Sequence, residues 1–147
     1  MWKLSMPDRL AAWKRFRHEL DSLEFELALK QVIKFWDRAP FNPYYLDYDP
    51  NTWPDPWTMI ADNCYCDVAK ALGIVYTIHL SAHKSDDIEL RVYRHKETRG
   101  LYNLVWINKG KYVLNLEADD FVNKKSIPTE LELIHKFTSV DMKLDRY

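Results

Sequence analysis

The chain has 147 residues, 47% of them hydrophobic and 29% charged, and a formal net charge of -1. This composition is typical of one globular domain with a substantial core, and the near-neutral charge gives no reason to expect nucleic acid or an anionic membrane as a partner. No apolar run approaches the ~18 residues of a membrane span.

The first 38 residues predict two helices. Apolar side chains recur at helical spacing twice, first at Leu10, Trp13, Phe16 and Leu20 and then at Phe25, Leu29, Val32, Ile33 and Trp36. Asp21 and Glu24 have the spacing of a capping box, which would start the second helix. That helix must end before Pro40, because proline cannot continue it.

Residues 39–56, called the strap below, hold five of the seven prolines and three tyrosines. Proline fixes φ and removes a donor, so we expect a rigid, extended segment packed across the domain surface or into a partner. Amphipathic aromatic rings are enriched at interfaces, although they also serve simply to pack a core. The candidate interaction residues are Trp2, Tyr44, Tyr45, Tyr48, Trp53 and Tyr147.

Residues 57–123 predict a central helix and a sheet. The helical stripe from Trp57 to Leu72 includes Cys64, and Gly73 is suited to the end of the helix. Period-two alternation then predicts strands at 74–80 and 88–93, followed by a hairpin over 102–116. Residues 124–147 are expected to form a C-terminal helix and tail, with Pro128 in its first turn. The fold class is α+β, with N-terminal helices and a central helix packed on a mostly antiparallel sheet of about four strands.

The hairpin carries one asparagine on each strand. A three-residue loop, Asn108 to Gly110, would pair Ile107 with Lys111 and place Asn103 directly opposite Asn115. A two-residue loop would instead place Asn103 opposite Leu116. We favour the first register, in which the two amides bond to each other and to nearby backbone.

A helix with a cysteine near its start, followed by a hairpin of the form GxYVL, resembles the bacterial transglutaminase-like cysteine peptidases over residues 53–117. The resemblance implies that Cys64 holds the place of the nucleophile, with a histidine base on the first hairpin strand and an aspartate on the second. This chain has Asn103 and Asn115 there instead. An amide cannot accept the proton of a thiol, so we expect no catalytic residue, and no cofactor or metal is indicated.

The cysteines leave two possibilities open. If one helix runs on from Pro56, Cys64 lies about two turns inside it and is an inert core thiol. If Asp62 or Asn63 caps a fresh helix, Cys64 sits at a helix N-terminus and could be reactive. Cys64 and Cys66 are too close for an ordinary disulfide framework and fit a reducing compartment.

The sequence therefore favours a non-catalytic transglutaminase-like domain that acts as a structural or interaction component of a larger protein assembly. The chain as a whole also resembles small proteins of tailed bacteriophages, which implies a virion part such as a tail, neck or baseplate. The alternative function is a cysteine hydrolase or acyltransferase with Cys64 as the nucleophile. The N-terminus lacks the apolar core of a signal peptide, so we expect a cytoplasmic protein, or a virion component if the phage resemblance holds.

Overall fold

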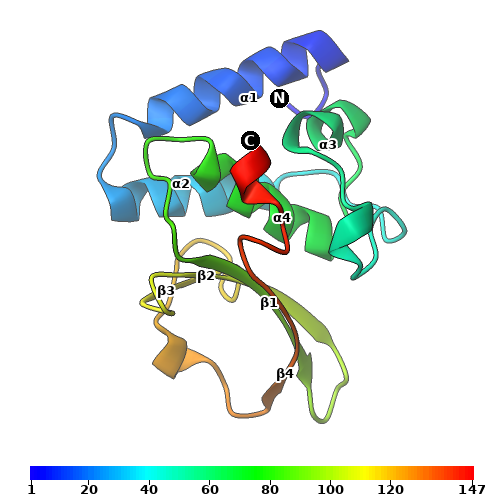
Figure 1. Ribbon diagram of the computed structural model, residues 1–147, viewed down its shortest axis with the longest axis vertical. Coiled ribbons are helices and arrows are strands. Elements are labelled where there is room, and N and C mark those ends of the chain that lie inside the picture. Colours follow the sequence, from blue (N-terminus) through cyan, green and yellow to red (C-terminus); the bar gives the residue numbers. More distant parts are fainter.

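Four helices form one layer and a four-stranded antiparallel sheet forms the other in the computed structural model, which describes residues 1–147 (Figure 1). The helices are α1 (Met6–Leu20), α2 (Phe25–Asp37), α3 (Pro56–Asp62) and α4 (Asp67–His79). The strands are β1 (Ile88–His95), β2 (Leu101–Ile107), β3 (Tyr112–Leu114) and β4 (Leu131–Phe137), in the order β3-β2-β1-β4. The predicted α+β class and the antiparallel sheet are confirmed.

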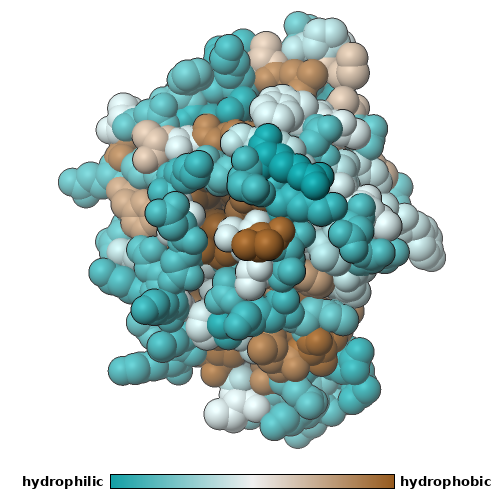
Figure 2. Space-filling view, in the orientation of Figure 1, coloured by the Kyte–Doolittle hydropathy of each residue, from teal (hydrophilic) through white to brown (hydrophobic).

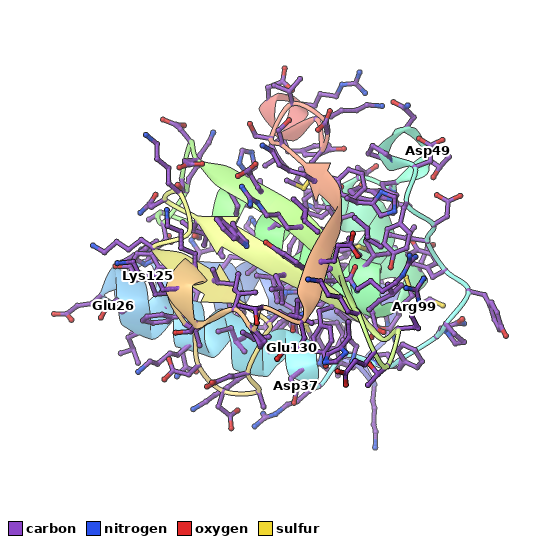
Figure 3. The ribbon with its side chains drawn as sticks, turned by 90° about the horizontal axis from the view of Figure 1, so that it is seen from below. Glu26, Asp37, Asp49, Arg99, Lys125 and Glu130 are labelled. Carbon is purple, nitrogen blue, oxygen red and sulfur yellow. The ribbon has the colours of Figure 1, made fainter.

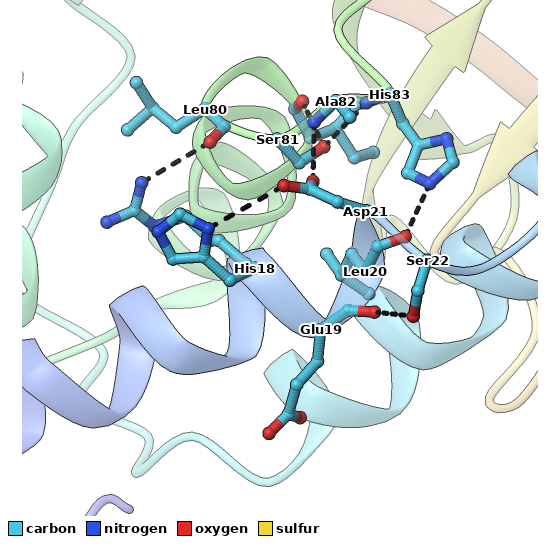
Figure 4. A network of polar contacts seen from close by, with 11 residues as sticks. His18, Glu19, Leu20, Asp21, Ser22, Leu80, Ser81, Ala82 and His83 are labelled. Carbon is cyan, nitrogen blue, oxygen red and sulfur yellow. Dashed lines mark hydrogen bonds and ion pairs between the residues drawn. The ribbon is translucent and has the colours of Figure 1, made fainter.

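The helices α1 and α2 lie where the apolar spacing predicts them, but the predicted capping box is wrong. Glu24, not Asp21, is the N-cap of α2, and it makes no side-chain cap hydrogen bond. Asp21 instead ends α1, and its Oδ1 accepts a hydrogen bond from the backbone N–H of Ala82 at 2.8 Å (Figure 4). His83 Nε2 lies 2.7 Å from the carbonyl oxygen of Leu20 in the same network. These contacts fasten the turn between α1 and α2 to the segment that follows α4.

The single helix predicted across residues 57–73 is wrong, because the chain breaks it into α3 and α4. Asn63 ends α3 in the left-handed region, with φ +50°, which asparagine tolerates better than most residues. The new helix then runs through Gly73 to His79, so the strand predicted at 74–80 is wrong as well. Every residue from Ala71 to His79 is buried, so this segment carries no polar stripe that would mark it as a helix.

Gly73 lies in the middle of α4 rather than at its end. A Cβ there would lie 2.5 Å from two ring atoms of Trp36, closer than any real contact. The absent side chain therefore lets α2 and α4 approach closely, and Trp36, only 1% exposed, lies between them.

The predicted C-terminal helix is also wrong, because residues 131–137 form β4 at the edge of the sheet. β4 pairs antiparallel with β1, and a register shift between Val92 and Tyr93 marks an irregularity in that pair. Pairing with β4 satisfies the backbone groups of β1 on the side that β2 leaves free, so this segment is a strand rather than a helix. The chain then returns to the helical layer, where Met142 and Leu144 are buried.

Both termini lie in the helical layer (Figure 1). Trp2 packs against Trp36 and Tyr65, with ring centroids 5.2 Å apart in each pair. Tyr147 packs against Tyr76 at 5.7 Å. The two ends of the described chain are therefore held by its own core.

Hydrophilic residues predominate on the face shown in Figure 2, where apolar side chains form small, separate groups. None of the helices combines the length and the hydropathy needed to cross a membrane.

Candidate functional site at the start of α4

Cys66, rather than Cys64, lies at the start of the central helix. It is the N-cap residue of α4 and is 5% exposed. Its Sγ lies 3.7 Å from the carbonyl oxygen of Leu46 in the strap. Cys64 lies in the link between α3 and α4 and is half-buried. A fresh helix thus begins in this region, as one sequence alternative proposes, but Cys66 occupies its N-terminus.

A row of three side chains crosses the sheet beside this helix start. Val92 on β1 is paired with Asn103 on β2 and with His135 on β4. Directly opposed residues share a face of a sheet, and Val92 belongs to the core packed against α4. Asn103 and His135 therefore both face the helical layer, on either side of Val92.

Tyr48 of the strap lies over this row and links it to Cys66. Its ring stacks on that of His135, with centroids 4.9 Å apart and planes inclined by 21°. Burial raises the pKa of Tyr48, a hydrogen bond from the Asn103 side chain acts in the opposite direction, and the nearby Cys66 raises it further. Asn103 is 4% exposed, and its Oδ1 has no hydrogen-bond partner. The strap thus places a phenol ring between the helix start and the sheet.

The predicted register of the hairpin is wrong by one residue. Ile107 pairs with Tyr112 and Val105 with Leu114, so four residues connect the strands. Continuing this pairing places Asn103 opposite Leu116, as in the less favoured of the two predicted registers.

The two asparagines nevertheless meet. Asn115 follows β3 with φ +76°, and its Nδ2 donates to the backbone carbonyl oxygen of Asn103 at 2.8 Å. The left-handed backbone turns Asn115 towards β2, so the side chain of one residue bonds to the main chain of the other. This contact fixes the hairpin and leaves the Asn103 side chain to face Tyr48.

A hollow of about 240 Å³ opens between the strap, the start of α4 and the start of β2. We call it the strap groove. It is lined by Phe41, Pro43, Leu46, Tyr48, Val68 and Leu101, together with Cys66 and Asp67.

The Cys66 thiol makes its hydrogen-bonding contact with a main-chain group rather than with a side-chain base. The sulfur of Cys66 contacts a backbone carbonyl, which cannot take its proton. Asn103 is an amide, and His135 stacks on Tyr48 rather than bonding to the thiol. The arrangement offers apolar walls to a ligand, and no side-chain base hydrogen-bonds to the Cys66 thiol.

Most of the predicted interaction residues contact their own domain. The ring of Trp53 packs against Phe137 at 4.8 Å, and the Tyr45 hydroxyl donates to Asp62 at 2.6 Å. Trp2, Tyr48 and Tyr147 are likewise engaged, as described above. Tyr44 differs, because it is 92% exposed. Five of the six rings therefore contribute to the packing of the domain itself.

Sequence reasoning missed Cys66 and His135 as members of the site. The sequence favours Cys64 over Cys66 as the nucleophile because Cys64 lies on the predicted helical stripe, and the break between α3 and α4 removes that reason. His135 was placed on a helix that the structure replaces with β4. The sequence signal that could have located the break is Asp62-Asn63, a pair of residues suited to ending one helix and starting another.

Comparison with known proteins supports the fold. No profile of a known family matches this chain, and no curated protein sequence does either. Among solved structures, calcium-bound LapG of Legionella pneumophila is 15% identical, with a TM-score of 0.73 over 93% of this chain and 78% of that one. A second LapG structure from this organism and EGTA-treated LapG are each 16% identical, with a TM-score of 0.72 over 91% of this chain and over 76% and 74% of those chains. The chain therefore has a LapG-like fold, the transglutaminase-like fold of bacterial cysteine proteases.

Proposed function

We propose that this chain is a non-catalytic domain of transglutaminase-like fold that serves as an interaction component of a larger protein assembly. The observation that carries the proposal is the surroundings of Cys66. Its sulfur lies against the Leu46 carbonyl, and the polar side chain that faces this region from β2 is the amide of Asn103. A working thiol nucleophile needs a base within hydrogen-bond reach, and an amide cannot serve as one.

The position of Tyr48 supports the same proposal. Its ring fills the space over the Asn103–Val92–His135 row, where a substrate would have to approach both the thiol and the sheet. Burial and aromatic stacking hold the ring in place. Because Tyr48 occupies this space, we expect a partner to bind at the outer edge of the strap instead.

Thiol reactivity tests this proposal directly. Two variants with one cysteine each, Cys64→Ser and Cys66→Ser, would be treated with a thiol reagent between about pH 5 and 9. We expect both remaining thiols to react slowly below pH 7, and Cys66 more slowly than Cys64 because it is more buried. Fast reaction of Cys66 below pH 7 would indicate an activated thiolate and contradict the proposal.

A second candidate function is a cysteine hydrolase or acyltransferase with Cys66, not Cys64, as the nucleophile. The N-cap position of Cys66 favours it, because a helix N-terminus stabilises a thiolate. His135 would have to act as the base after Tyr48 moved away. His135→Gln would then slow the reaction of Cys66 with the reagent, whereas an inert thiol would be unaffected.

We infer from the sequence resemblance alone that the assembly is a phage virion part such as a tail, neck or baseplate. Mass spectrometry of purified particles would test this inference. Stoichiometric amounts of the chain in the particles would support it, and its absence from them would contradict it.

A further inference from the structure

The strap groove is an exposed apolar surface. Phe41 is 58% exposed and Leu101 is 42% exposed, and both line the groove. Tyr44, 92% exposed, stands on the strap beside it. Apolar side chains grouped around a hollow on the surface mark a place where another molecule docks.

The chain that forms most of the groove is acidic. Between Arg38 and Lys70 it contains five aspartates and neither lysine nor arginine. These aspartates are Asp47, Asp49, Asp55, Asp62 and Asp67. None of them forms an ion pair within the chain.

Most of these carboxylates accept hydrogen bonds from neutral groups, which leaves their charge uncompensated. Asp49 accepts from the backbone N–H of Asn51, and Asp62 accepts from the Tyr45 hydroxyl. Asp67 is exposed and lines the groove itself. A ligand with positive charge would find free carboxylates here.

The basic residues nearest to the groove along the sequence are Arg38, Lys70 and Arg99, which lie two or three residues from Phe41, Val68 and Leu101. In Figure 3, Arg99 and Asp49 lie towards the same side of the molecule. None of these three lines the groove or pairs with an aspartate. The one charged residue in the lining of the groove is therefore the carboxylate of Asp67.

We propose that the strap groove binds an extended segment of a partner protein in which apolar residues alternate with lysine or arginine. The apolar side chains enter the groove against Phe41 and Leu101, and the cationic ones reach Asp67 and the strap aspartates. The inference rests on the proposed function, since a working peptidase would cleave such a segment rather than hold it. A second copy of this chain is a poor occupant, because a two-fold interface would place the same acidic surface against itself.

The test uses a short fluorescent peptide of alternating Lys and Leu, with two counterparts in which Glu replaces Lys or Ser replaces Leu. Binding to the intact protein is followed by fluorescence anisotropy. We expect the Lys/Leu peptide to bind at least about tenfold more tightly than either counterpart, because each of them loses one of the two complementary features. Its affinity should fall as the screening length decreases from about 10 Å in 0.1 M salt to about 3 Å in 1 M salt.

Two matched variants locate the surface. Leu101→Lys places a charge on the wall of the groove, and Leu27→Lys makes the same change on α2, where Leu27 is 46% exposed outside the groove. Both sites are open to solvent, so both variants should keep the fold, as circular dichroism would verify. We expect Leu101→Lys to weaken binding of the Lys/Leu peptide at least about tenfold, whereas Leu27→Lys should leave its binding unchanged.

Equal binding of the Glu/Leu peptide, or undiminished binding by Leu101→Lys, would overturn the inference. So would a dimer in sedimentation that Leu101→Lys dissociates, because the occupant would then be a second copy. Binding of the Lys/Leu peptide followed by its cleavage in a reaction that requires Cys66 would support the inference about the groove and overturn the proposed function. Absence of peptide binding together with unreactive thiols would overturn the inference about the groove and leave the proposed function standing.

Discussion

Thr77 joins three parts of the buried core, and its replacement by valine is the sharpest test of the helical packing. Its Oγ1 accepts from the indole N–H of Trp13 at 3.1 Å and from that of Trp36 at 2.9 Å. The hydroxyl itself donates to the carbonyl oxygen of Gly73 at 2.7 Å. Thr77 has no exposed surface, and each tryptophan is 1% exposed. One hydroxyl thus fastens α1 and α2 to α4.

Thr77→Val keeps the shape of the side chain and removes the acceptor. Two buried indole N–H groups would lose their partner, and each such loss costs about 1–3 kcal/mol. Water cannot replace the hydroxyl, because the site is buried among Trp13, Trp36 and Gly73. We therefore expect the free energy of unfolding to fall by about 2–6 kcal/mol, a large part of the about 5–15 kcal/mol typical of a domain.

Urea unfolding followed by circular dichroism and tryptophan fluorescence measures this loss. Thr77→Ser is the matched control, because it keeps the hydroxyl and removes one methyl group, at a cost of about 1 kcal/mol. In a Trp36→Phe background, where one donor is already absent, the valine substitution should cost less than in the wild type. If valine costs no more than serine, the hydroxyl does not hold the three helices together and the reasoning is refuted.

Three further substitutions test other parts of the structure. Gly73→Ala should lower the melting temperature, because overpacking against the Trp36 ring costs about 1–3 kcal/mol and outweighs the about 1 kcal/mol gain in helix propensity; a higher melting temperature would show that the helices can separate at no cost. Burial lowers the pKa of His79, so the unfolded chain binds this proton more readily than the folded one. The free energy of unfolding should therefore fall as pH decreases below about 6.5, and less steeply in His79→Gln; equal slopes in urea titrations at several pH values would contradict this. Arg9 is 6% exposed and donates to the carbonyl oxygens of Ile60 and Ala61 at the end of α3. Arg9→Met should cost about 3 kcal/mol, and an effect below that of the exposed Arg15→Met would show that α3 does not depend on it.

The sequence predicts the amphipathic and alternating elements of this fold correctly. The second helix has a polar face and an apolar face, so its spacing is visible, and α2 lies where the pattern places it. The first five residues of β1, Ile88 to Val92, follow the alternation of apolar and polar residues. Local propensity was sufficient there because each element has one buried side.

The sequence does not identify α4, which is buried on all sides. Ile74, Tyr76 and Ile78 alternate as in a strand, but Val75 and Thr77 between them are buried too. A uniformly apolar run fits either period, and only the packing of the other elements decides between them. The same holds for β4, whose residues form a strand because β1 offers an open edge.

The chemistry of the candidate site was determined in part by the sequence alone. The residue types exclude a histidine from the hairpin, and this holds for any fold of the chain. The tertiary structure decided which cysteine starts the central helix, that the ring of Tyr48 stacks on His135 beside Asn103, and that Asp67 lies among the apolar residues of the strap groove. These relations join residues from four segments that are distant along the chain, and side-chain contacts at such separations depend on packing rather than on local propensity.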